Sequence, residues 1–111
     1  MGYIKHNAVI VSGWRVMEAH LKAHEIFKKL GFEQLVSPII NGILNGQDSF
    51  FIAPDGSKEG WDTSDECDKA RKEFLDWLTK SENYADYIEI RFGGDDEDVT
   101  IVRDKDSDLN N

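Results

Sequence analysis

Residues 45–61, NGQDSFFIAPDGSKEGW, decide the fold, because they contain a turn, a strand and a second turn in succession. Asn45-Gly46 is typical of a type I′ hairpin turn, in which both residues take positive φ. Residues 49–53 form an aromatic and β-branched run that favours a strand. Residues 54–57, PDGS, have the chemistry of a turn. The stretch therefore predicts a hairpin strand followed by a polar, glycine-rich connector (residues 54–61), a type of segment that often carries function.

The residues before this stretch predict two strands and a helix. Residues 3–12 become continuously apolar, as in a central strand buried on both faces or nearly so. Residues 15–30 have helical spacing, and Gly31 is the expected stop. Residues 36–44 predict a strand that is bent at Asn41-Gly42 and pairs with residues 48–53. The apolar stripe predicted for the helix consists of Met17, Leu21, His24 and Phe27, widened by Ala23, Ile26 and Leu30.

The residues after the connector predict a second helix and two more strands. Thr63 and Glu66 match a capping box that opens the helix. Residues 87–92 alternate as in a strand, residues 93–97 match a hairpin loop, and residues 98–102 match a short acidic edge strand. The predicted apolar face of the helix consists of Cys67, Ala70, Phe74, Trp77 and Leu78.

This order of elements predicts an α+β fold: a two-layer sandwich with a mainly antiparallel sheet and both helices on one face. The first six elements have the βαββαβ order of a ferredoxin-like split βαβ. We expect one domain over residues 1–103 and a disordered acidic tail over residues 104–111. Phe50 and Phe51 point to opposite faces of their strand, so one of them should lie on the open face as a dimer contact or a ligand platform.

The charge of the chain is strongly negative, with a formal net charge of −9 over 111 residues. Residues 95–111 contain seven acidic and two basic residues, which accounts for five of these nine charges. The balance argues against direct binding to nucleic acid, which needs clustered Lys and Arg. It fits a solubilising tail, a basic partner or mimicry of nucleic-acid charge.

A lone cysteine, Cys67, favours a reducing compartment, because one thiol cannot form an internal disulfide. No apolar run of 18 or more residues and no cleavable signal pattern occurs in the sequence, so we expect a cytoplasmic protein without membrane contact.

Patterns for catalysis and metal binding are weak. His20 and His24 share a helix face, but the glutamate of an HExxH motif is missing, so packing is the favoured interpretation. Cys67 lies on an apolar stripe, where cysteine usually acts as a small hydrophobe. Asp104, Asp106 and Asp108 lack the glycine and glutamate of an EF-hand. Neither a P-loop nor GxGxxG is present. The sequence predicts no enzyme, no cofactor and no metal site.

The connector offers the better candidate site, for a small anionic ligand. Its glycines free backbone N–H groups to face an anion. Ser57 adds a hydroxyl, Lys58 a charge and Trp61 a flat surface for stacking. Arg71, two turns into the second helix, could reach back to the same ligand. The alternative is that PDGS is only a turn and that Trp61 covers the core.

Several blocks of the chain resemble a family of small acidic proteins encoded by tailed bacteriophages. The resemblance covers most of the chain up to Arg103, and PDGSKEGW is its most specific part. It implies a setting, that of an accessory anti-defence protein in the host-cell cytoplasm, rather than a mechanism. The blocks are HNAVIV (6–11), VSP (36–38), NG (45–46), SFFIAPDGSKEGW (49–61) and the spaced residues Asp68, Arg71, Phe74, Trp77 and Leu78.

Three functions follow as hypotheses. The first is a homo-oligomeric binding protein that sequesters a small anion, such as a cyclic nucleotide immune signal, through Ser57, Lys58, Trp61 and Arg71. The second is an acidic inhibitor that binds a host protein or mimics nucleic acid. The third is a small enzyme with a site based on His6 or His24.

Overall fold

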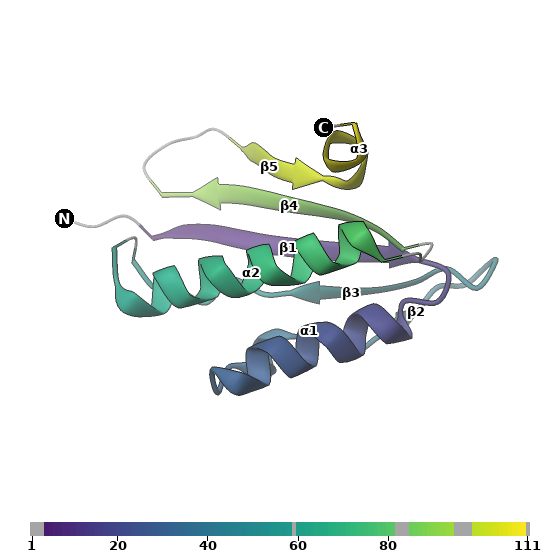
Figure 1. Ribbon diagram of the computed structural model, residues 1–111, viewed down its shortest axis with the longest axis horizontal. Coiled ribbons are helices and arrows are strands. Elements are labelled where there is room, and N and C mark those ends of the chain that lie inside the picture. The colour runs from purple at the N-terminus through teal and green to yellow at the C-terminus, as the bar shows by residue number, and fades with distance from the viewer. Residues whose placement is uncertain (1–3, 59, 82–84, 95–98, 111) are drawn as a thin grey trace.

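The computed structural model describes residues 4–58, 60–81, 85–94 and 99–110 (Figure 1). None of the helices within these ranges is long and apolar enough to cross a membrane. The elements, in chain order, are β1 (Lys5–Gly13), α1 (Met17–Lys29), the 3-10 turn η1 (Glu33–Leu35), β2 (Ile40–Asn41), β3 (Asp48–Ile52), α2 (Asp62–Lys80), β4 (Ala85–Gly93), β5 (Thr100–Asp104) and α3 (Lys105–Leu109).

The five strands form one sheet in the order β2-β3-β1-β4-β5, and every neighbouring pair is antiparallel. β3 lies between β1 and β2, which is the arrangement of a split βαβ unit, and β5 extends that unit at its edge. Helices α1 and α2 lie side by side on one face of the sheet (Figure 1). The predicted two-layer α+β sandwich is therefore confirmed.

The core lies between the helices and the face of the sheet that they cover. Alternate strand residues point into it, because side chains along a strand alternate between faces. Each large apolar side chain buried there contributes roughly 1.5–3 kcal/mol to the free energy of unfolding. The fully buried members include Val9, Val11, Phe50 and Ile52 from the sheet, Ala23 and Phe27 from α1, and Phe74 and Leu75 from α2.

The other face of the sheet carries no helix in the described part of the chain. β1 is accordingly buried on one face only: Val9 and Val11 are inaccessible, whereas Ile10 between them is exposed. The prediction that this strand is buried on both faces or nearly so is wrong for the uncovered face, where Ile10 is 40% exposed, because the continuous apolar run reflects the composition of both faces and not two covering layers.

Helix α1 presents only part of the predicted stripe to the core: Ala23, Ile26 and Phe27 are buried as predicted, whereas its first large residues are not. Met17 and Leu21 are exposed, at 66% and 63% of their surfaces. The alanines at positions 19 and 23 point inward instead, with Ile26 and Phe27. Small side chains let the helix approach a sheet face that bulky residues already fill, and the larger Met17 and Leu21 are left on the outside.

The predicted strand over residues 36–44 is reduced to two residues. Ile40–Asn41 pairs with β3 as a strand, and Val36 adds a single antiparallel bridge to Ile52. Before this strand, the Ser37 hydroxyl accepts a hydrogen bond from the backbone N–H of Phe51 at 2.9 Å and so replaces a ladder bond. After the two-residue strand, Gly42 lies against the backbone of Gln47. An added Cβ at Gly42 would lie 1.9 Å from the Gln47 carbonyl oxygen. Asn45 and Gly46 both have positive φ, as the hairpin turn requires.

Helix α2 begins before the predicted capping box. Trp61 is its N-cap, without a side-chain capping bond, so Thr63 lies within the first turn. The predicted face is largely confirmed, since Cys67, Ala70, Phe74 and Leu78 are buried and Trp77 packs partly buried against the core.

The C-terminal residues 104–110 are ordered rather than forming the predicted disordered tail. Asp104 caps α3 by accepting a hydrogen bond from the Ser107 N–H at 2.8 Å. Arg103 Nε donates to Asp108 at 2.8 Å, and the Tyr87 hydroxyl donates to the same carboxylate. Arg103 also reaches Asp76 on α2 at 3.0 Å. Acidic residues that suggest a solvated tail thus act as cap and ion-pair partners.

The predicted loop over residues 93–97 lies mostly outside the described residues.

Candidate functional site

In the connector, the Asp55 side chain accepts the hydrogen bonds that hold the turn. Asp55 accepts a hydrogen bond from the Ser57 N–H at 3.3 Å, and the Ser57 hydroxyl donates to the same carboxylate oxygen. Ser57 is buried. Gly56 has a φ of 81°, which a residue with a side chain rarely adopts. Both donors of Ser57 are therefore already used within the turn.

Arg71 lies below this turn in a buried ion cluster, which we define as Arg71, Asp55, Asp68 and Glu89. Only 2% of Arg71 is exposed. Its Nη2 contacts Asp68, its Nε lies 3.4 Å from a Glu89 oxygen, and its Nη1 lies 3.9 Å from an Asp55 oxygen. The longer two contacts are ion pairs without hydrogen-bond geometry.

The buried ion cluster has a negative net charge, because three carboxylates surround one guanidinium. A further anion at Arg71 would meet the repulsion of those carboxylates in a poorly hydrated place. Asp55 comes from the connector, Asp68 from α2 and Glu89 from β4, so the cluster fastens these three elements together.

Lys58 and Trp61 lie apart from the buried ion cluster. The Lys58 ammonium is 5.8 Å from the centre of the Trp61 ring, a cation–π contact. Trp61 is 54% exposed and is not a cover of the core. The four residues predicted for one ligand site thus divide into a buried pair, Ser57 and Arg71, and a second pair in which Lys58 is half-buried and Trp61 is exposed.

The cysteine and histidines occupy packing positions. Burial, with a smaller contribution from nearby Asp55, raises the pKa of the Cys67 thiol to about 11, so the nucleophilic thiolate is disfavoured. His20 Nε2 lies 2.8 Å from the Ser37 carbonyl oxygen, and its ring packs edge-on against Phe50. Within the described ranges no group of three or more His, Cys, Asp or Glu side chains is placed to hold a metal.

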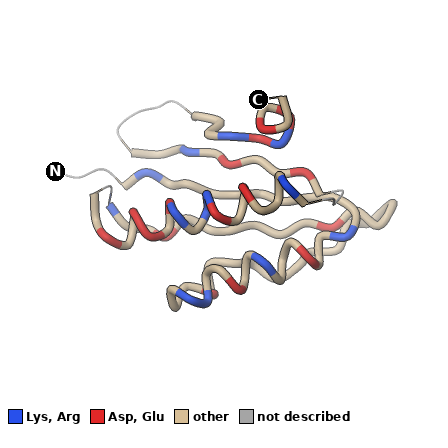
Figure 2. The backbone as a smooth tube through the Cα atoms, viewed as in Figure 1, with Lys and Arg blue, Asp and Glu red and all other residues tan. Residues whose placement is uncertain are grey.

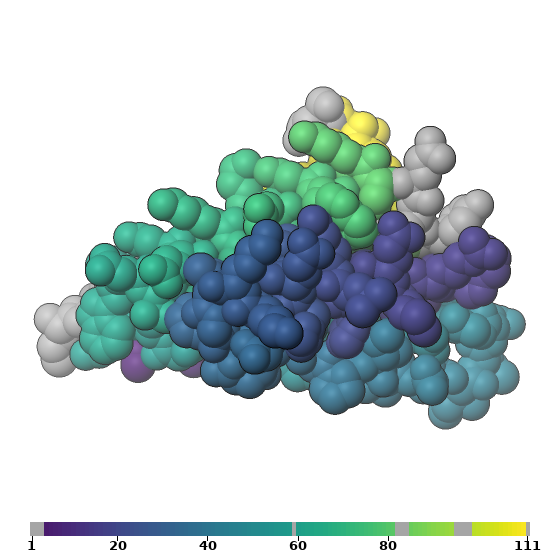
Figure 3. All heavy atoms as spheres, turned by 60° about the horizontal axis from the view of Figure 1, so that its bottom comes forward, coloured from purple at the N-terminus to yellow at the C-terminus, as the bar shows by residue number. Residues whose placement is uncertain are grey.

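A groove that the sequence did not predict lies at the corner between β1 and α1. We call it the corner groove. Its volume is about 860 Å³. Figure 3 shows this end of the molecule, where purple residues of the β1–α1 turn adjoin blue residues of the β2–β3 hairpin. Its lining consists of Trp14, Arg15, Val16, Met17, Glu18, Leu21, Ile39, Asn41, Gly46 and Asp48.

Trp14, Met17 and Leu21 give the corner groove an exposed apolar wall. Trp14 contacts the hairpin closely, since a Cβ at Gly46 would lie 3.5 Å from its ring. The Arg15 guanidinium stacks 4.3 Å from the centre of the Trp14 ring, and Arg15 has the positive φ of 64° that is uncommon outside glycine. Ile43, in the same hairpin loop, is 98% exposed. Alanines spaced as 19 and 23 were the signal in the sequence that Met17 and Leu21 face outward.

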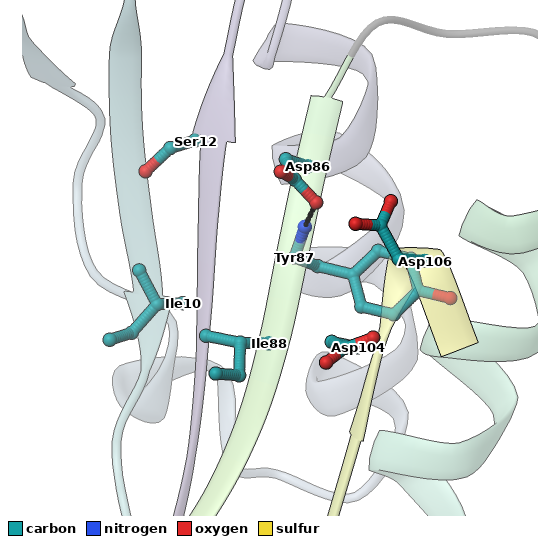
Figure 4. A pocket seen from close by; sticks show the side chains of 7 residues that line it. All are labelled: Ile10, Ser12, Asp86, Tyr87, Ile88, Asp104 and Asp106. Carbon is teal, nitrogen blue, oxygen red and sulfur yellow. Dashed lines mark hydrogen bonds between the residues drawn. The ribbon is translucent and has the colours of Figure 1, made fainter. Parts of the chain in front are cut away.

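A smaller pocket lies at one end of the open sheet face (Figure 4). We call it the acidic pocket. Its volume is about 330 Å³. Asp86 accepts a hydrogen bond from the Tyr87 N–H at 2.9 Å, and Asp104 serves as the cap of α3. The pocket combines an apolar floor with a carboxylate rim; its lining consists of Ile10, Ser12, Asp86, Tyr87, Ile88, Asp104 and Asp106.

Comparisons of the chain with protein-family models, with curated proteins and with solved structures each returned no match.

Proposed function

We propose that this protein is a non-enzymatic binding protein that recognises another protein through the corner groove. The observation that carries the proposal is the exposure of Trp14, Met17 and Leu21 around one hollow. Large exposed apolar patches mark protein-binding surfaces in soluble proteins. Trp, Met and Arg are enriched at the centres of such interfaces, and Arg15 stacks on Trp14 at this position.

The charge of the molecule defines the partner further. Glu18 and Asp48 line the corner groove beside its apolar wall, and the whole chain has a net charge of −9. The complementary partner presents an apolar anchor surrounded by Lys or Arg, since opposite potentials speed association and exclude wrong partners. In the bacteriophage setting that the resemblance implies, this partner is a host protein in the host cytoplasm, and the chain acts as an acidic inhibitor.

The test first identifies a partner and then measures its affinity for the chain. The wild-type protein captures partners from a lysate of the bacterial host, mass spectrometry identifies them, and the purified candidate is titrated by calorimetry. We expect Leu21→Glu to weaken the affinity at least about tenfold, equivalent to about 1.4 kcal/mol. The matched control is Leu109→Glu, which changes an exposed leucine on α3 at the opposite edge of the sheet. A partner that binds Leu21→Glu as tightly as wild type overturns the assignment of the groove.

A second function, sequestration of a small anion such as a cyclic nucleotide, rests on the cation–π pair of Lys58 and Trp61. The pair stands next to the N-terminus of α2, whose dipole favours an anion. Asp62 and Asp65 in the first turn oppose that effect. Ser57 and Arg71 do not strengthen the site, because their donors face carboxylates.

Titration with cyclic dinucleotides, followed through tryptophan fluorescence, separates this function from the first. Saturable quenching in wild type that disappears in Lys58→Ala and persists in Lys28→Ala supports an anion site at the connector. Equal quenching in both variants contradicts it.

A further inference from the structure

The uncovered face of the sheet carries exposed apolar side chains on all five strands. We call it the open face. Register places Ile10 of β1 between Phe51 of β3 and Ile88 of β4, and Ile90 of β4 opposite Ile101 of β5. Cross-strand neighbours on one face contact each other, so these residues form one continuous band. The exposed members of this face are Ile10, Ile40, Phe51, Phe92 and Ile101.

The middle of the open face lacks charge. Figure 2 shows β1 and β3 without Lys, Arg, Asp or Glu except near their ends, at Lys5 and Asp48. A hollow of about 390 Å³ lies over this region, with Ile10, Phe51 and Phe92 among its lining. An antiparallel sheet that faces water normally carries polar side chains on its outer face. The open face therefore has the composition of a surface that is covered.

We infer that a second copy of this chain covers the open face, in a symmetric dimer with the two sheets packed face to face. The inference goes beyond the proposed function, which uses the corner groove.

The size of the open face suits a stable dimer. β1 and β4 each contain nine residues. β3 and β5 contain five residues each and β2 two. With a rise of about 3.3 Å per residue and about 4.8 Å between strands, the five strands cover roughly 480 Å² in projection. A standard interface takes about 800 Å² of surface from each partner, and side chains that interlock expose more surface than a flat projection.

The hydrogen-bonding groups at the two ends of the open face are complementary in one orientation. His6 and Phe92 pack against each other at one end, with ring centres 5.3 Å apart. The acidic pocket, with Asp86 and Asp104, lies at the other end. A two-fold axis perpendicular to the strands brings His6 of each copy onto the acidic pocket of the other, where the imidazole can donate a hydrogen bond to a carboxylate. A two-fold axis parallel to the strands would instead place the two acidic pockets at the same end of the dimer, where their carboxylates would repel each other.

Sedimentation equilibrium on the purified chain tests the dimer. We expect wild type to be dimeric at about 100 μM, and Phe51→Glu to weaken association at least about 100-fold, because the substitution places two carboxylates inside the interface. The matched control, Met17→Glu, changes an exposed apolar residue of the corner groove and should leave the dimer intact. Circular dichroism and thermal unfolding check that the variants fold, and Phe51→Ser serves if Phe51→Glu does not.

Two outcomes overturn the inference. One is a monomeric wild-type chain at that concentration. The other is a dimer that survives Phe51→Glu but is lost in Met17→Glu, which assigns self-association to the corner groove.

A pair of charge substitutions tests the orientation of the two copies in the dimer. His6→Glu should weaken the dimer, because it faces the acidic pocket of the second copy. The double variant His6→Glu/Asp86→Lys should restore association, since each new glutamate then meets a lysine across the interface. With the axis parallel to the strands, glutamate would meet glutamate, and the double variant would stay weak; that result overturns the proposed orientation.

Discussion

Phe50 and Phe51 are neighbours in β3 and chemically identical, yet the first is 1% exposed and the second 41%. The first lies under the helices and packs against Phe74 and His20, whereas the second lies on the open face. The difference between the two faces arises from the layer above each of them and not from the strand. A continuous apolar strand therefore shows that both faces prefer to be covered, and it leaves open which element or molecule covers each.

The largest expected effect comes from truncating these two residues in turn. Phe50→Ala should lower the free energy of unfolding by about 3–5 kcal/mol, because it removes a filled core position and leaves a cavity. Phe51→Ala should cost about 1 kcal/mol or less in the dissociated chain, where water already contacts the ring. Urea unfolding at a protein concentration below the dimer dissociation constant measures both. Equal losses would contradict the contrast between the faces.

The next effect concerns the buried ion cluster on the covered side. Arg71→Met should lower the free energy of unfolding by about 3 kcal/mol, because it leaves Asp55 and Glu89 as buried charges without a cation. Lys69→Met, on the exposed side of the same helix, is the matched control and should change it by less than about 0.5 kcal/mol. Unchanged stability in Arg71→Met would show that the arginine is not structural and would return it to the ligand site.

A third effect tests the burial of Cys67 beneath the helices. Its thiol has a folded-state pKa of about 11, above the ordinary 9.0, so the folded chain holds the proton longer than the unfolded chain. The stabilisation is fully present below pH 9 and is lost between pH 9 and 11, by up to about 2–3 kcal/mol. Urea unfolding of wild type and Cys67→Ala over this range isolates the thiol from tyrosine ionisation. Parallel pH profiles for the two proteins would mean that the thiol is not buried from solvent.

The smallest effect lies at the rim of the covered side, where α2 meets the C-terminal segment. The hydrogen bond from Lys72, together with one from Arg103, holds the pKa of Asp76 below its ordinary 3.8. The stabilisation is present above that value and is lost as the pH falls through the lower folded-state pKa. Asp76→Asn should cost less than about 1 kcal/mol at pH 7, since the pair is partly exposed. Thermal unfolding at pH 7 and pH 3 measures it, with Glu73→Gln as control; a loss that persists unchanged at pH 3 would argue against a charge effect.

The fold was largely predictable from the sequence, because hairpin chemistry at Asn45-Gly46 and two amphipathic helices fix the order of the elements. The orientation of α1 was not, since periodicity alone does not decide between a stripe of large residues, Met17 and Leu21, and a stripe with alanines. The structure of the acidic C-terminus was not predictable either, because Asp108 finds a partner in Tyr87 of β4, 21 residues away, and Arg103 pairs with Asp76 of α2, 27 residues away.

The candidate site was less predictable than the fold. Spacing along the chain placed Arg71 within reach of the connector, which the structure bears out through its contact with Asp55. It could not place Glu89, which arrives from β4 and completes the negative surroundings of the guanidinium. Tertiary neighbours of this kind decide whether an arginine binds a ligand or neutralises a carboxylate.

The shortness of β2 has a consequence for how copies of this chain assemble. A two-residue strand offers almost no backbone ladder at that edge of the sheet, and at the other edge the β4–β5 pairing is interrupted by a register shift at Glu89 and Ile90. Both edges are thus poor templates for adding a strand from another molecule. In the proposed dimer, association through the open faces would occupy the whole self-complementary surface, so the assembly would close at two copies instead of growing into a fibril.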